Sequence, residues 1–127
     1  MSCEILVVRG RLISTNTLIN TARTNRFLAA KQKHDQMDIV TAEILSDKEF
    51  RNNRYQGKVV VYIDFYEKDL KRDYDGVVGS GCKIILDALV ENKIIPDDSR
   101  RFVTKVPCEV FVDKVNPRIE IRLVEEI

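Results

Sequence analysis

Apolar residues recur along the chain at two spacings, and a two-residue spacing predicts three strands. The segment 58–66 (KVVVYIDFY) is apolar on both sides of the alternation, which is typical of a strand in the centre of a sheet. The segment 118–124 (RIEIRLV) alternates cleanly and predicts a half-exposed strand. The segment 4–13 (EILVVRGRLI) predicts a third strand. Its buried side is expected to be formed by Ile5, Val7 and Val8.

A spacing of three to four residues predicts two helices. The first covers 27–45, where apolar side chains fall on one helical face. These side chains are Phe27, Ala30, Met37, Val40 and Ile44. The second helix is expected to begin at Ser80 or Cys82 and to end at Asn92, because the glycines before it break local structure. These glycines are Gly76, Gly79 and Gly81.

The remaining segments predict loops and an edge strand. The polar composition of 14–25 and 51–57 is typical of loops. The segments 101–106 and 109–113 read as strand, and Pro107 between them indicates an edge strand or a bulge. The resulting order, β-α-β-α-β-β, predicts an α+β fold with a mixed sheet and helices packed mainly on one face.

Length and composition indicate one ordinary globular domain. The 127 residues, of which 44% are hydrophobic and 32% charged, are expected to form a single domain over 1–127. The chain contains neither an apolar run of membrane-spanning length nor a signal-peptide pattern, so we expect it in the cytoplasm. A single histidine, His34, and three widely spaced cysteines argue against a zinc site, a disulfide framework or a histidine-dependent triad.

The charges are unevenly placed, although the formal net charge is only +1. The stretch from Arg9 to His34 contains six arginines and lysines and not one acid. Such a stretch can hold phosphates even when the whole chain is nearly neutral. The candidate DNA-binding residues in it are Arg23, Arg26, Lys31 and Lys33. A second interpretation is that these side chains form an ordinary solvated helix face.

Acidic residues cluster in the second half of the chain. Asp73 and Asp75 are two positions apart, and on an extended segment such side chains point the same way, with Cα atoms roughly 6.6 Å apart. Carboxylate oxygens of this kind suit Mg²⁺ or Mn²⁺ and not zinc. An alternative interpretation is a solvated turn. Asp97 and Asp98, further along the chain, likewise lie in a sequence that suits a turn or a helix cap.

In this part of the chain the sequence resembles the RusA-type Holliday-junction resolvases, which are small, mostly phage-derived endonucleases. The residues that carry the resemblance are Arg72-Asp73-Tyr74-Asp75, Lys83 to Leu89 (KIILDAL) and Pro96-Asp97-Asp98-Ser99. The family pattern is Asp-x-Asp-Asn, a lysine, an Asp-Ala-Leu helix and an Asp-Asp pair in this order. The match is close over 71–101 and loose in the N-terminal part.

The resemblance implies a metal-dependent endodeoxyribonuclease that cuts four-way DNA junctions symmetrically as a homodimer. Asp73, Asp75 and Asp98 would hold Mg²⁺ or Mn²⁺, and Lys83 would offset the charge of the attacked phosphate. Arg72 matches a basic residue that is expected to touch DNA. From the residues alone, Lys83 is equally able to form a helical pair with Asp87.

The sequence departs from the family pattern at two places, and these departures leave alternatives open. Gly76 stands where the family usually has asparagine after the second acid, and the gap from Asp75 to Lys83 is longer than in the best-known member. The alternatives are a junction-binding module with weak or no catalysis, and a nuclease that acts on other branched DNA. A purely structural dimer would give no reason for the set of acids.

Overall fold

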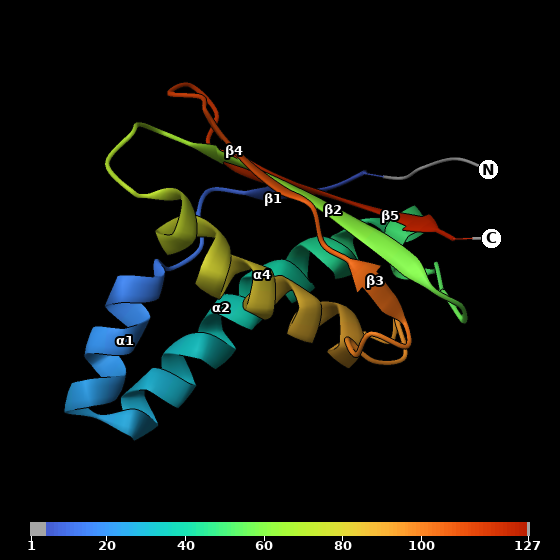
Figure 1. Ribbon diagram of the computed structural model, residues 1–127, viewed down its shortest axis with the longest axis horizontal. Coiled ribbons are helices and arrows are strands. Elements are labelled where there is room, and N and C mark those ends of the chain that lie inside the picture. Colours follow the sequence, from blue (N-terminus) through green and yellow to red (C-terminus); the bar gives the residue numbers. More distant parts are fainter. Residues whose placement is uncertain (1–4, 127) are drawn as a thin grey trace.

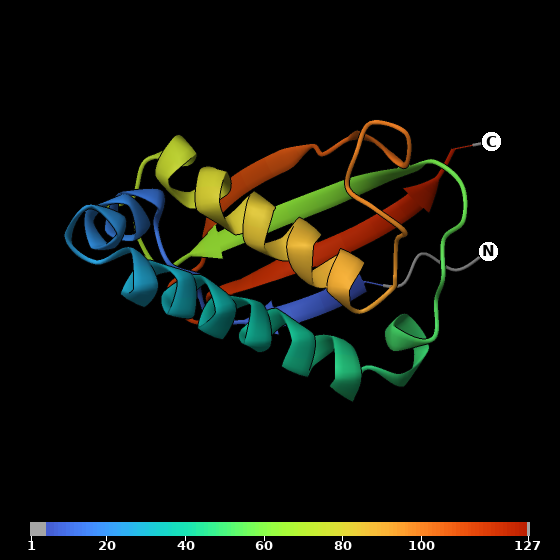
Figure 2. The same ribbon diagram turned by 90° about the horizontal axis from the view of Figure 1, so that it is seen from below.

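The computed structural model describes residues 5–126. Within these residues, five strands form one mixed sheet, and four helices pack against it on one face (Figure 1, Figure 2). The helices are α1 (Thr15–Thr24), α2 (Arg26–Ser46), α3 (Lys48–Arg51) and α4 (Tyr74–Glu91). The strands are β1 (Ile5–Arg9), β2 (Val59–Glu67), β3 (Val103–Lys105), β4 (Cys108–Val112) and β5 (Arg118–Glu125). The predicted α+β fold is confirmed.

Strand β2 is the centre of the sheet, as its two-sided apolar pattern predicts. It pairs antiparallel with β5 along its length and parallel with β3 and β4 on its other side. Strand β1 lies beyond β5 and pairs antiparallel with it. The break between β3 and β4 contains Pro107, which confirms the predicted interruption of an edge strand.

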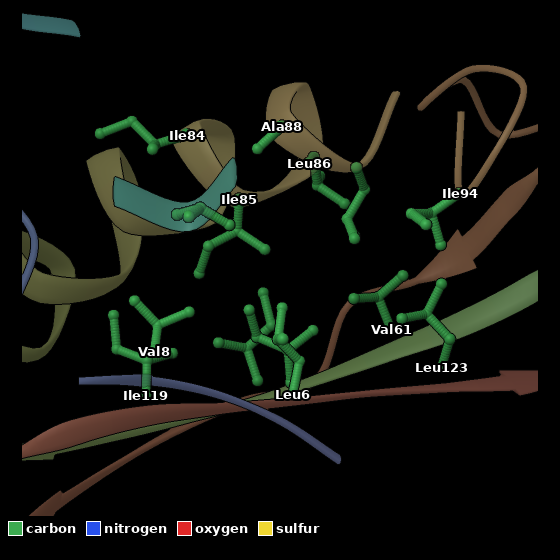
Figure 3. Close-up of a cluster of buried hydrophobic side chains, with 14 of the residues drawn as sticks. Leu6, Val8, Val61, Ile84, Ile85, Leu86, Ala88, Ile94, Ile119 and Leu123 are labelled. Atoms are coloured by element: carbon green, nitrogen blue, oxygen red, sulfur yellow. The ribbon is translucent and has the colours of Figure 1, made fainter. Parts of the chain in front are cut away.

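The core lies between the sheet and the helices. Alternate residues of β5 point into it, so that Ile119, Ile121 and Leu123 are buried, and the apolar side of α4 covers them (Figure 3). The clean alternation of 118–124 therefore predicts this strand correctly. Over the described residues, no helix combines the length and apolarity that crossing a membrane requires.

The predicted buried side of β1 is wrong for Ile5 and Val7 and right for Val8. Leu6 and Val8 are buried, whereas Ile5 and Val7 are 48% and 40% exposed on the face of the sheet that carries no helix. The strand is apolar on both sides, so its own sequence does not distinguish the two faces. Pairing with β5 decides between them, because the register places Leu6 opposite the buried Ile121.

The predicted loop at 14–25 is instead helix α1. Ser14 caps this helix and accepts a hydrogen bond from the Thr17 amide. Threonine hydroxyls bond back to carbonyls one turn earlier, as Thr21 does to Thr17 at 2.9 Å. The helix has no fully buried residue and lies against α2 and α4. Its Thr- and Asn-rich sequence therefore becomes helical through its cap and its neighbours.

Helix α4 begins at Tyr74, earlier than predicted, and the three glycines lie inside it. Two of them are packing positions and not breaks. A Cβ atom on Gly81 would come within 2.7 Å of the Phe65 ring, and one on Gly79 would come within 2.9 Å of the Thr15 hydroxyl. Phe65 and Thr15 approach the helix so closely that only glycine fits at these two positions. The low helix propensity of glycine does not reveal this packing role.

Candidate active site at the start of helix α4

Asp73 and Asp75 line one pocket where the starts of α1 and α4 meet. The pocket has a volume of 370 Å³ and is called the α4 pocket here. Its lining residues are Ser14, Thr15, Asn16, Lys71, Arg72, Asp73, Asp75 and Gly76. The lining combines hydroxyl, amide, carboxylate and basic groups, which is the chemistry of a site for a hydrated cation or a phosphate.

The two carboxylates reach the pocket from different backbone conformations. Asp73 is the extended N-cap residue of α4, and its side chain makes no capping hydrogen bond. Asp75 lies in the first helical turn, so the predicted fully extended pair is wrong. Both side chains are exposed, and neither forms an ion pair within the part of the chain that the structure describes. Two unpaired carboxylates at one pocket are suitable oxygen ligands for Mg²⁺ or Mn²⁺.

The side chain of Arg72 is partly buried beside the carboxylate of Glu67. Its guanidinium donates to the Leu12 carbonyl at 2.8 Å and lies 3.7 Å from the carboxylate of Glu67. Arg11 pairs with the same carboxylate at 3.3 Å, and Glu67 is only 4% exposed. This arrangement ties the loop before Asp73 to the loop after β1. The predicted DNA contact of Arg72 stays a prediction.

Asp98 and Lys83 lie in a second charged cluster further along α4. The ammonium of Lys83 contacts Asp87 at 3.0 Å and Asp98 at 3.1 Å. The hydrogen bonds that Lys83 donates to the carboxylates of Asp87 and Asp98 raise its pKa. Burial favours a higher pKa for Asp87, but hydrogen bonds from Lys33 and Lys83 outweigh it and hold this pKa below its ordinary value. The helical pair of Lys83 with Asp87 is thus present in the structure, and Asp98 extends it.

The three predicted metal ligands do not share one pocket. Lys83 follows Asp75 by eight residues on α4, which corresponds to about 12 Å along a helix axis. Asp98 lines a hollow with Lys83 and Asp87 and is not among the residues of the α4 pocket. The structure therefore brings Asp73 and Asp75 together and leaves Asp98 apart. The role of Asp98 as a metal ligand stays a prediction.

Another acidic group lies on the surface of α2. Within the described residues, His34, Asp35 and Asp38 place one ligand atom each within 4.8 Å of one another. All three are exposed, and Asp35 is already paired with Lys31 at 2.9 Å. Exposed groups of this kind occur widely without a metal, so this cluster carries no function in our interpretation.

The predicted DNA-binding residues fall into two classes. Arg23 and Arg26 are exposed near the corner between α1 and α2, which projects from the sheet (Figure 1). Lys31 is paired with Asp35 at 2.9 Å, and Lys33 is paired with Asp87 at 3.0 Å. The two arginines are therefore the more available cations. Their contact with DNA stays a prediction.

Ser14, Thr15, Asn16 and Lys71 line the pocket but were not expected there. The sequence predicts a loop at 14–25, and a predicted loop has no defined position relative to Asp73. The place of Ser14, Thr15 and Asn16 beside the aspartates could therefore not be predicted. The signal that could have located them is Ser14 itself, since a serine followed by a helix is a frequent N-cap. A helix start at Ser14 would have indicated a second helix N-terminus near the acids.

The chain matches no protein-family model and no curated protein. The resemblance to RusA-type resolvases therefore rests on the ordered residues between Arg72 and Ser99.

Proposed function

We propose that the protein is a Mg²⁺-dependent endodeoxyribonuclease of the RusA type that resolves four-way DNA junctions. The observation that supports the proposal best is the α4 pocket, where Asp73 and Asp75 meet beside two helix N-termini. The order of residues from Arg72 to Ser99, which resembles the resolvase pattern, supplies the substrate class.

The residues of the pocket fit a hydrated divalent cation. Mg²⁺ is usually held in proteins by one or two carboxylates, with waters and substrate phosphate oxygens as its other ligands. Asp73 and Asp75 provide that number of carboxylates. When bound, such a metal ion supplies an activated water and stabilises charge on the attacked phosphate.

The rest of the pocket favours the phosphate of a DNA strand. The first amides of α1 and α4 carry the positive ends of two helix dipoles. Lys71 adds a positive side chain to the lining, which also includes Arg72, although the Arg72 guanidinium lies beside Glu67. These groups reduce the repulsion between a phosphate and the two aspartates, so that the substrate and the metal ligands can occupy the same pocket.

Asp98 and Lys83 are assigned supporting roles in the proposed reaction. They neutralise each other in a 3.1 Å ion pair, so metal binding is assigned first to Asp73 and Asp75. Their predicted roles, as a third ligand and as a charge near the phosphate, require that this pair opens and that both side chains approach the α4 pocket, whose lining includes neither of them. A homodimer would supply two active sites related by a dyad, which matches two symmetric cuts in a junction with two-fold symmetry.

The proposal is tested with a synthetic four-way junction and a linear duplex of the same arms, in the presence of Mg²⁺. We expect the wild-type protein to cut the junction symmetrically and to leave the duplex uncut. Asp73→Asn and Asp75→Asn should each abolish cleavage and retain binding in a gel-shift assay, because the amide removes a ligand charge without changing the side-chain shape. Parallel loss of binding and folding in these variants would contradict a catalytic role.

Asp69→Asn is the matched control for these variants. Asp69 lies in the same loop, outside the residues that line the α4 pocket, and its carboxylate accepts a hydrogen bond from the Lys71 amide. An asparagine oxygen accepts the same bond, so this variant should cut the junction at the wild-type rate.

A junction-binding module without catalysis is the second candidate function. The observation that favours it is Gly76, which lines the pocket where the family usually has asparagine. Binding of the junction by the wild-type protein without cleavage, in Mg²⁺ and in Mn²⁺, would support this second function over the first. Cleavage of flaps or forks in preference to four-way junctions would indicate a nuclease for other branched DNA.

A further inference from the structure

The hydroxyl of Thr15 is inserted into the backbone of helix α4. Its oxygen accepts a hydrogen bond from the Ser80 amide at 2.9 Å. The same hydroxyl lies 3.2 Å from the Gly76 carbonyl and 3.3 Å from the Asp75 carbonyl, to which it donates. In a regular α-helix the Ser80 amide bonds the carbonyl four residues earlier, which belongs to Gly76. Thr15 therefore bridges a donor and an acceptor that are partners in an ordinary helix.

The packing around this hydroxyl leaves room for it and for little else. A Cβ atom on Gly79 would lie 2.9 Å from the Thr15 oxygen, closer than real Cβ contacts allow. Ser80 is only 6% exposed, and its own hydroxyl donates to the Ile13 carbonyl at 2.7 Å. The Thr15 side chain thus bonds the backbone of α4, and the Ser80 side chain of α4 bonds the backbone just before α1. The start of α1 is bound to α4 by these hydrogen bonds.

The linkage joins the backbone of a proposed metal ligand to the opposite wall of the α4 pocket. Thr15 is the first residue of α1, and it bonds the carbonyl of Asp75 itself. The two walls of the α4 pocket come from 14–16 and 71–76. Contacts that orient a metal ligand from behind commonly change metal affinity or activity by about 10- to 100-fold when they are removed.

We propose that Thr15 is a positioning residue of the active site, which fixes Asp75 and the first turn of α4 against the start of α1 through its inserted hydroxyl. This inference rests on the proposed metal-dependent function. It assigns to Thr15 no contact with the metal or with DNA. Its effect passes through the backbone of residues 75–80.

The test compares Thr15→Val with Thr15→Ser. Valine keeps the shape of threonine but replaces the hydroxyl with a methyl group, which leaves the Ser80 amide without this acceptor. Serine keeps the hydroxyl and removes only a methyl group. Thr21→Val is the matched control, because the Thr21 hydroxyl donates to the Thr17 carbonyl within α1.

The measurements are Mn²⁺ binding to the free protein by electron paramagnetic resonance, junction cleavage against Mg²⁺ concentration, and thermal unfolding. Thr15→Val should weaken Mn²⁺ binding about tenfold and raise the Mg²⁺ concentration for half-maximal cleavage by a similar factor. Thr15→Ser should restore both values to within about twofold of wild type. Thr21→Val should leave Mn²⁺ binding and the Mg²⁺ concentration for half-maximal cleavage unchanged, even if it lowers thermal stability slightly.

The outcomes separate this inference from the function on which it rests. Wild-type protein that neither binds Mn²⁺ nor cuts a junction refutes the proposed function, and the positioning role is refuted with it. Wild-type protein that binds Mn²⁺ while Thr15→Val binds it equally well overturns only the role of Thr15. Equal weakening in Thr15→Val and Thr15→Ser also overturns it, because the hydroxyl would then be irrelevant.

A second variant tests the same linkage from the side of α4, in case Thr15→Val is poorly folded. Gly79→Ala places a methyl group 2.9 Å from the Thr15 oxygen, too close for the hydroxyl to stay where it is, while improving local helix propensity. We expect weaker Mn²⁺ binding by this variant, with the far-ultraviolet helix signal retained. Unchanged Mn²⁺ binding in Gly79→Ala would contradict the proposal independently of Thr15→Val.

Discussion

Gly76 lies in the first turn of α4 and lines the pocket that contains Asp73 and Asp75. A Cβ atom at this position would meet no other atom within 4 Å, so the pocket has room for a side chain. Its backbone is helical and therefore places no demand on glycine. The absence of the family's asparagine is thus a property of the sequence and not a steric requirement of the fold.

Under the proposed function, introducing asparagine at this position should increase junction cleavage. In Gly76→Asn the amide can donate a hydrogen bond to a neighbouring carboxylate and orient it as a metal ligand. We expect the rate of junction cleavage at limiting Mg²⁺ to rise about three- to tenfold, in line with the effect of groups that support metal ligands. Single-turnover cleavage over a series of Mg²⁺ concentrations measures this change.

Gly76→Ala is the control for this prediction. Both substitutions replace a glycine inside a helix, which is expected to stabilise the fold by up to about 1 kcal/mol. Only asparagine adds an amide to the pocket. If alanine increased cleavage as much as asparagine, the gain would come from helix stability, and the orienting role of the amide would be excluded.

At the scale of elements, ionic contacts join α2 to α4. Lys33 on α2 contacts Asp87 on α4 at 3.0 Å, and Lys83 contacts the other oxygen of the same carboxylate at 3.0 Å. The Asn92 amide donates to the Thr41 hydroxyl at 3.0 Å further along the same interface. The Asp87 side chain is only 22% exposed, so this pair is better shielded from solvent than most surface pairs.

Replacing Asp87 with asparagine should therefore make the free energy of unfolding less dependent on pH in the acidic range. Because hydrogen bonds from both lysines lower the pKa of Asp87 against the effect of burial, its carboxylate stabilises the fold above about pH 4, the ordinary pKa of aspartate. That contribution is lost as the pH falls through the lowered pKa. We expect Asp87→Asn to reduce the free energy of unfolding by about 1 kcal/mol at pH 7.

Urea denaturation of wild type and variant at pH 7 and at pH 3 measures this difference, which should shrink at the lower pH. Asp35→Asn is the control, because Asp35 pairs with Lys31 on the exposed surface of one helix and its side chain is 53% exposed. It should change stability little at either pH. A difference for Asp87→Asn that is the same at both pH values would show that packing, and not charge, is the cause.

At the scale of the whole molecule, a net charge of +1 provides almost no general attraction for DNA. The DNA binding that the proposed function requires would then come from a local patch. Arg23 and Arg26 are exposed at the corner between α1 and α2, away from the end of the sheet where β1 begins and β5 ends (Figure 2). A dimer would present two such corners to the arms of a junction.

Replacing Arg23 and Arg26 with alanine should flatten the salt dependence of junction binding. Each phosphate contact contributes about −0.9 to the slope of log affinity against log salt on duplex DNA. The double variant should lose roughly one unit of slope for each lost contact per protomer, with little change in thermal stability. Gel-shift titrations at several salt concentrations provide the slope.

Lys48→Ala with Lys58→Ala removes the same charge from exposed positions in α3 and in the segment before β2. This control pair should keep the wild-type slope. An equal loss of slope in both double variants would mean that total charge and not the α1–α2 corner governs binding. An unchanged slope without Arg23 and Arg26 would show that their surface is merely solvated.

The sequence by itself determined the parts of the fold that depend on local periodicity. Segments 58–66 and 118–124 became β2 and β5, and the helical spacing of 27–45 became α2. These patterns predict structure because the spacing of apolar residues reflects the repeat of the element that buries them. In α2 only the second half of the predicted face is buried, at Val40 and Ile44, whereas Phe27 is 78% exposed. The pair of aspartates could also be predicted as neighbours, since two positions cannot separate side chains far.

Only the tertiary structure decided how the remaining pieces combine. The side of β1 that is buried depends on pairing with β5, and the helical state of 74–81 depends on Phe65 and Thr15, which approach Gly81 and Gly79. The position of Asp98 beside Lys83, apart from Asp73, also depends on how the chain after α4 folds back. Such choices rest on contacts between residues far apart in the sequence, and short-range patterns carry no information about those contacts.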